Sequence, residues 1–119
     1  MNYSKMNALT AAILLYLIGQ TLIFFQTNGQ FFSKWFATHP IFLSIVGGSI
    51  ISYCFILGTK YAFEYFEGLL WPGRFMGFAI GVSSYAILTY IFMGEGISWK
   101  TATSLVLSVA IIWIQLFWK

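Results

Sequence analysis

The sequence predicts an all-α integral membrane protein with four transmembrane helices, formed by one domain that covers residues 1–119. Three observations lead to this prediction: 60% of the residues are hydrophobic, 21% are aromatic and only 8% are charged. Soluble domains carry about 25% charged residues, so this chain has too few charges to cover a water-facing surface. Four helices of about 20 residues each would cross a bilayer within this length.

Composition and charge also exclude several classes of function. A soluble enzyme, a nucleic-acid-binding protein and a disordered tail all need more polar surface than the chain offers. The six basic residues give a net charge of +3, but they stand singly near the ends of hydrophobic runs, as in interfacial anchoring. We therefore expect a lipid bilayer around the protein and no nucleic acid as a partner.

The first span is expected over residues 8–26, an apolar run that follows Lys5 and ends at a polar stretch. A cleaved signal peptide is the alternative, because a basic residue before an apolar core matches its outline. However, the run is long, no small-x-small cleavage site follows it, and further spans come after it. A transmembrane helix is therefore the preferred interpretation.

The other three spans are expected over residues 40–66, 74–93 and 99–118. Pro40 suits the start of a helix, because its missing N–H group needs no partner there. A break at residues 71–74 precedes the third span. The turn at residues 94–96 is so short that the last two spans are expected to form an antiparallel hairpin.

Four spans would place both chain ends on the same side of the membrane. That side would carry four basic residues and the opposite side two, so the positive-inside rule favours cytoplasmic termini in an inner or plasma membrane. Dual topology stays open because the difference is small. The four are Lys5, Lys60, Arg74 and Lys119, and the two are Lys34 and Lys100.

Small residues recur at intervals of four along three of the expected helices. Such stripes allow helices to approach closely in lipid, either within one protomer or between two copies. A ligand cavity would form more naturally between two copies, because a bundle of four helices has little room inside. The stripes are Ser44, Gly48 and Ser52, then Gly73, Gly77 and Gly81, then Ser104 and Ser108.

A cluster of polar residues ends the second span. Lys60, Glu64 and Glu67 share one helical face, and Tyr53 extends that face inward. One interpretation is a solvated helix end with a weak Lys60–Glu64 surface pair. The other is that Glu64 enters a cavity, where an ionisable side chain is a candidate for function.

Two further polar residues are candidates for a substrate or ion path. Gln20 lies well inside the first span, where it either bonds a neighbouring helix or contacts a substrate. Arg74 either pairs with Glu64 or Glu67, or binds a lipid phosphate or an anionic substrate. The path candidates are thus Glu64, Tyr53, Gln20, Arg74 and Lys60.

The sequence carries no recognisable enzyme signature. One histidine, one cysteine and three acidic residues supply no metal-ligand set, and no Gly-rich phosphate-binding loop is present. We therefore expect no enzymatic activity, no metal and no cofactor.

Short motifs in the second half of the chain are Phe63-Glu64-Tyr65, Pro72-Gly73-Arg74 and the turn Gly94-Glu95-Gly96 before the last span. In these motifs, roughly over residues 40–119, the chain resembles the drug/metabolite transporter superfamily. Its layout is most similar to a small four-helix family of unknown function. The small multidrug resistance proteins and the small subunits of an aminoarabinose–lipid flippase are similar in size and layout.

The resemblance implies a four-helix protomer that works as a dimer and carries a small molecule or a lipid-linked group by alternating access. Glu64 and Arg74 match the family's Glu and Arg, and Glu95 matches the acid of the turn. Small multidrug resistance proteins bind cations and protons through an acid in the first helix. This chain has none there, the nearest polar residue being Gln20, so that proton-coupled mechanism is not expected.

Three functions therefore remain open. The first is a small homodimeric transporter for a small molecule or a lipid-linked group. The second is a non-transporting accessory subunit that packs against a partner membrane protein through its stripes of small residues. The third is lipid head-group binding or flipping. Fold alone does not decide among them.

Overall fold

A computed structural model describes residues 3–118 of the chain, and this part is helical, without strands. Within it, four helices are long and apolar enough to cross a membrane, which confirms the predicted all-α membrane fold class. They are α1 (Tyr3–Asn28), a continuous helix over Pro40–Tyr65, α5 (Trp71–Met93) and α6 (Trp99–Phe117).

The second span contains an irregular turn near its start. It consists of α3 (Pro40–Phe42), a π-helical turn, η2 (Leu43–Gly47), and α4 (Gly48–Tyr65). The Gln26 side chain donates a hydrogen bond to the Leu43 carbonyl oxygen at 2.9 Å. A Cβ atom at Gly47 would lie 3.5 Å from the Gln26 amide nitrogen. That distance is an ordinary contact, so it is the Gln26 hydrogen bond that ties this turn to α1.

Two short elements connect the first and second spans. They are η1 (Gly29–Phe31) and α2 (Lys34–Thr38). A Cβ atom at Gly29 would lie 2.3 Å from the Phe36 ring, so only glycine lets the ring pack against this backbone. α2 therefore packs back against η1 within this connection.

Two helices begin earlier than the expected spans. α1 begins at Tyr3 rather than at residue 8, and α5 begins at Trp71 rather than at residue 74. Pro72 stands in the first turn of α5, where its missing N–H group costs no hydrogen bond. The residues expected to break the chain thus start a helix, and this places Arg74 on α5.

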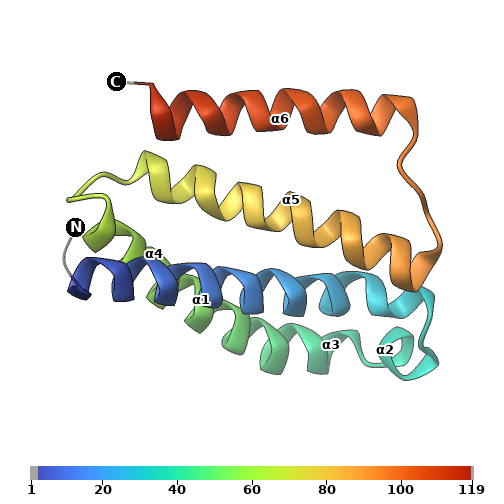
Figure 1. Cartoon of the computed structure of the whole chain (residues 1–119). Coiled ribbons are helices and arrows are strands. Elements are labelled where there is room, and N and C mark those ends of the chain that lie inside the picture. The colour runs from blue at the N-terminus through green and yellow to red at the C-terminus, as the bar shows by residue number, and fades with distance from the viewer. Residues whose placement is uncertain (1–2, 119) are drawn as a thin grey trace.

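The helices pack side by side in one bundle (Figure 1). α1 packs against α4 and α5, and the antiparallel α6 packs chiefly against α5. The core consists of Ala12 and Tyr16 from α1, Ala62 from α4 and Met76 from α5. α6 contributes no buried residue to the described structure. The start of α1 and the end of α6 lie at the same end of the bundle (Figure 1).

The glycine stripe of α5 lies inside the protomer. A Cβ atom at Gly73 would lie 3.0 Å from the Ala62 Cβ atom, and one at Gly77 would lie 3.6 Å from the Tyr16 ring. A Cβ atom at Gly81 would lie 2.8 Å from the Gln20 amide. These three glycines therefore bring α5 close to α4 and α1.

The serines of the other two stripes do not bond to neighbouring helices in the described structure. Ser44 donates to the Pro40 carbonyl oxygen, and Ser108 donates to that of Ser104, each four residues back along its helix. Ser104 donates to the Lys100 carbonyl oxygen, and Ser52 is exposed. Gly48 faces the Gln26 side chain, 3.7 Å from where its Cβ atom would lie.

Candidate functional site

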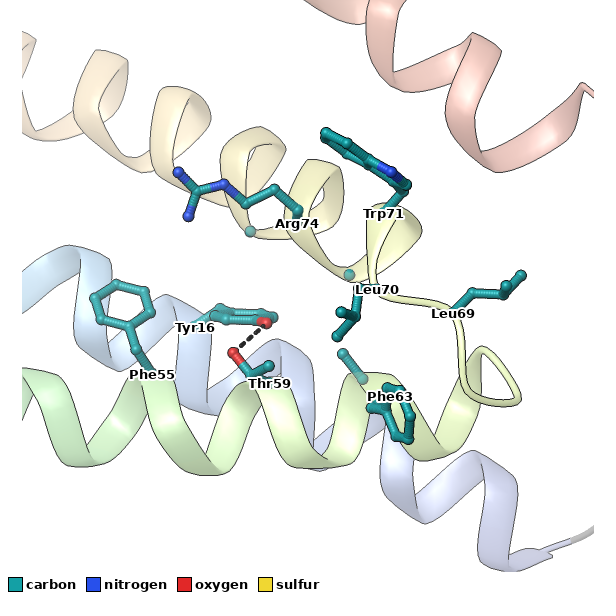
Figure 2. Close-up of a pocket in the computed structure, with 11 residues that line it drawn as sticks. Tyr16, Phe55, Thr59, Phe63, Leu69, Leu70, Trp71 and Arg74 are labelled. Carbon is teal, nitrogen blue, oxygen red and sulfur yellow. Dashed lines mark hydrogen bonds between the residues drawn. The ribbon is translucent and has the colours of Figure 1, made fainter.

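A half-open cavity of about 590 Å³ lies between α1, α4 and α5. Its volume falls within the range of about 300–1,000 Å³ that is usual for ligand pockets. The helix end of α4, the loop over residues 66–70 and the start of α5 form one side (Figure 2). The lining is mainly apolar and aromatic, and includes Tyr16, Phe55, Thr59, Phe63, Trp71 and Arg74.

Tyr16 forms the base of this cavity and is only 5% exposed. Its hydroxyl group lies 3.2 Å from the Thr59 hydroxyl group, and either can donate (Figure 2). A Cβ atom at Gly58 would lie 3.2 Å from the Tyr16 ring. Gly58 therefore gives the ring the space that a side chain would narrow, and Gly77 faces the same ring at an ordinary contact distance.

Arg74 is the one charged residue among the described residues that line the cavity. Within residues 3–118 its guanidinium group forms no ion pair. The expected pairing with Glu64 or Glu67 is thus not formed. Glu67 pairs with Lys5 instead, and Glu64 is exposed and outside the cavity.

The Lys5–Glu67 ion pair joins the first turns of α1 to the loop between α4 and α5. The pKa of Glu67 is lowered because Lys5 donates a hydrogen bond to it and attracts its negative charge. The Lys5 ammonium group also lies 6.0 Å from the centre of the Tyr65 ring. Glu67 is therefore paired with Lys5 rather than with Arg74.

A second cavity, of about 420 Å³, lies between α5 and α6. Gln20, Thr89 and Glu95 supply polar groups to its lining. The Gln20 amide donates to the Gly77 carbonyl oxygen at 3.4 Å. Because Gly77 lines the first cavity and Gln20 the second, this contact stands between the two.

Three of the predicted path residues lie outside both cavities. Glu64 and Lys60 are exposed, and Tyr53 is 64% exposed. The Lys60 ammonium group lies 5.5 Å from the Tyr61 ring centre rather than pairing with Glu64. The structure thus brings Arg74 together with Tyr16 and Thr59, and Gln20 together with Thr89 and Glu95.

Sequence reasoning missed three residues that the cavities contain. Tyr16 could have been noticed as a lone phenol inside the apolar first run, but its partner Thr59 could not. Thr89 is 8% exposed, and its hydroxyl has no hydrogen-bond partner in the part of the chain described. No group of three or more His, Cys, Asp or Glu side chains gathers within residues 3–118.

Comparison with known proteins gives no match to a family model, to a curated protein or to a solved structure. The functional argument therefore depends on the fold and on the two cavities.

Proposed function

We propose that this protein is a small transporter that moves a small molecule or a lipid-linked group across the bilayer by alternating access. The cavity between α1, α4 and α5 carries this proposal, because it combines a mainly apolar lining with one cation, Arg74, that forms no ion pair within residues 3–118. A cavity that is apolar with a few placed polar groups is the usual form of a small-molecule site. The resemblance of the short motifs in residues 40–119 to those of the drug/metabolite transporter superfamily favours the same function.

The working unit in this proposal is a homodimer in an inner or plasma membrane, with both termini cytoplasmic. Alternating access needs two bodies that move relative to one another, and a second copy supplies the other body. α6 is compatible with this unit because it has no buried residue in the described structure and leaves a whole helix face, with Val106 and Trp113 at 68% and 63% exposed, on which a second copy can pack.

Proteoliposomes provide the test. The purified chain is reconstituted with NBD-labelled phosphatidic acid or phosphatidylcholine, and dithionite quenching reports transbilayer movement. We expect a protein-dependent rate for at least one of these lipids, and a crosslinked dimer in the same vesicles. No rate above that of protein-free vesicles, together with a monomer, would contradict the proposal.

Two tryptophan variants of α4 make the test specific for the cavity. Thr59→Trp places a bulky ring inside the cavity. Ile56→Trp places the same ring at a position outside the cavity lining, where the natural side chain is 66% exposed. We expect Thr59→Trp to lower the rate severalfold and Ile56→Trp to leave it unchanged. Equal rates in the two variants would show that the lipid does not cross through this cavity.

The uncovered surface of α6 also favours a second candidate, a non-transporting accessory subunit. In that case a partner membrane protein would cover α6 and would co-purify with the chain. The same proteoliposomes would then give no movement, and Thr59→Trp would have no effect on the partner's activity.

A further inference from the structure

We infer that the cavity between α1, α4 and α5 binds an amphiphile with one anionic group, a carboxylate or a phosphate, held by Arg74. The apolar or aromatic body of this ligand fills the rest of the cavity. The inference names the substrate class of the proposed function and rests on that function for its role. Its chemistry rests on what lines the cavity.

The charge of the lining selects an anion. Arg74 has no ion-pair partner within residues 3–118, and no acidic residue lines the cavity there. A guanidinium group stays protonated at any ordinary pH, so Arg74 keeps a positive charge in a lining that is mainly apolar. Its planar fork of donors matches a carboxylate or a phosphate. An anionic group would supply the missing partner.

The two other polar side chains of the cavity, Tyr16 and Thr59, are uncharged and partly satisfied by each other. The Tyr16 and Thr59 hydroxyl groups lie 3.2 Å apart and bond to each other. The other large lining side chains are apolar, with the rings of Phe55, Phe63 and Trp71 among them. The lining therefore asks for one charged end on the ligand, and a long apolar body can leave through the open side of the cavity.

The position of Arg74 suits this arrangement. Its side chain extends from the first turns of α5 alongside the cavity, whereas Trp71 points away from Tyr16 (Figure 2). A cationic ligand would be repelled by Arg74 and would find no carboxylate in the lining. A neutral ligand would leave the exposed guanidinium group to water and would gain nothing from its charge.

A competition experiment on the full chain in a nonionic detergent tests the ligand class. The fluorescence of NBD-labelled lauric acid reports binding. Laurate, lysophosphatidic acid, dodecanol and dodecyltrimethylammonium are the competitors. We expect the two anions to displace the probe at concentrations at least about tenfold lower than the alcohol and the cation. If lysophosphatidic acid displaces the probe at the lowest concentration, the source of the anionic group is a lipid phosphate. If laurate does so, the source is a free carboxylate.

Charge variants test the residue. Hydrogen bonds to charged groups contribute about 1.5–3 kcal/mol, so we expect Arg74→Gln to weaken binding about tenfold or more. Arg74→Lys keeps the positive charge but loses the planar fork of donors. Its affinity for the probe should lie between those of the unchanged chain and Arg74→Gln. Lys60→Gln removes a positive charge from an exposed residue outside the cavity, and should leave binding unchanged.

Several outcomes would overturn the inference. These are equal binding by Arg74→Gln and the unchanged chain, an equal loss in Lys60→Gln, or a cation that competes as well as laurate. If Arg74→Gln does not fold, the competition series on the unchanged chain still decides. Binding with these preferences but without transbilayer movement would reject the transporter and keep the inference. Transbilayer movement at the same rate for charged and uncharged head groups would reject the inference and keep the transporter.

Discussion

The Tyr16 hydroxyl group on α1 lies 3.2 Å from the Thr59 hydroxyl group on α4. This contact joins the two most extensively packed helices of the bundle at the base of the cavity. Lipid offers little hydrophobic drive for helix association, so hydrogen bonds and close packing between helices decide how they meet. The same pair of hydroxyl groups thus supports the fold and completes the cavity lining.

A double-mutant cycle of Tyr16→Phe and Thr59→Val measures this contact. Interhelical hydrogen bonds in membrane proteins contribute about 0.6 kcal/mol on average and at most about 1.7. We expect a coupling free energy in this range from unfolding in mixed micelles. Thr10→Val is the control, because the Thr10 hydroxyl bonds only to the Met6 carbonyl oxygen of its own helix. No coupling between the two variants would show that the hydroxyl groups prefer other partners.

The close approach of α5 to α4 predicts that Gly73→Ala destabilises the bundle. The new Cβ atom would lie 3.0 Å from the Ala62 Cβ atom, and neither atom can rotate away. The helices must therefore separate slightly, at a cost of about 1 kcal/mol or more. Thermal unfolding of the purified chain measures this cost.

Gly48→Ala is the matched control for this substitution. A Cβ atom at position 48 would lie 3.7 Å from a flexible Gln26 side chain, which is an ordinary contact. The better helix propensity of alanine, up to about 1 kcal/mol, should therefore leave stability unchanged or raise it. Equal losses in both variants would mean that glycine is needed for backbone freedom rather than for close packing.

The buried hydroxyl group of Thr89 predicts that Thr89→Val stabilises the protein. This hydroxyl has no partner within residues 3–118, and an unsatisfied buried polar group costs about 1–3 kcal/mol. Valine has nearly the same shape, so we expect a higher unfolding temperature. Ser84→Ala is the comparison, since Ser84 is as buried but donates to the Gly81 carbonyl oxygen at 3.1 Å. A loss in both variants would reveal a partner for Thr89, supplied by a bound molecule or by a second copy.

The helices of this fold could be predicted from sequence because each apolar run has the length of a bilayer span. The start of α5 was less clear, since Pro72 and Gly73 are typical of breaks as well as of first turns. The structure resolves this in favour of a first turn. Run length thus predicts a span better than it predicts where the span begins.

The candidate site was predicted only in part, because it depends on how each helix is rotated. α4 turns Ile51, Cys54, Gly58 and Ala62 inward. Each residue advances by about 100° around a helix, so Glu64 lies far around the helix from Ala62 and is exposed. An almost uniformly apolar helix gives no amphipathic pattern that would fix this rotation. Arg74 lines the first cavity together with Thr59 and Tyr16, and this grouping depends on how three helices pack, which no single apolar run indicates.

The ion pair between Lys5 and Glu67 predicts a pH dependence at the start of α1. The folded-state pKa of Glu67 is lowered by Lys5, so the pair contributes stability above the ordinary glutamate pKa of about 4.3. This contribution is lost as the pH falls through the lowered folded-state pKa. Because the pair is exposed, we expect a local effect on the first turns of α1 and little change in global unfolding.

Hydrogen exchange of the N-terminal segment measures this effect. The unchanged chain is compared with Glu67→Gln at each pH, because the intrinsic exchange rate also changes with pH and this comparison cancels it. At neutral pH we expect the unchanged chain to exchange more slowly than the variant. The difference should shrink below about pH 4 and vanish once Glu67 is protonated. Glu95→Gln removes a carboxylate near the second cavity and should leave this segment unaffected. A difference that persists at low pH would show that the glutamine amide, rather than the lost charge, disturbs the loop.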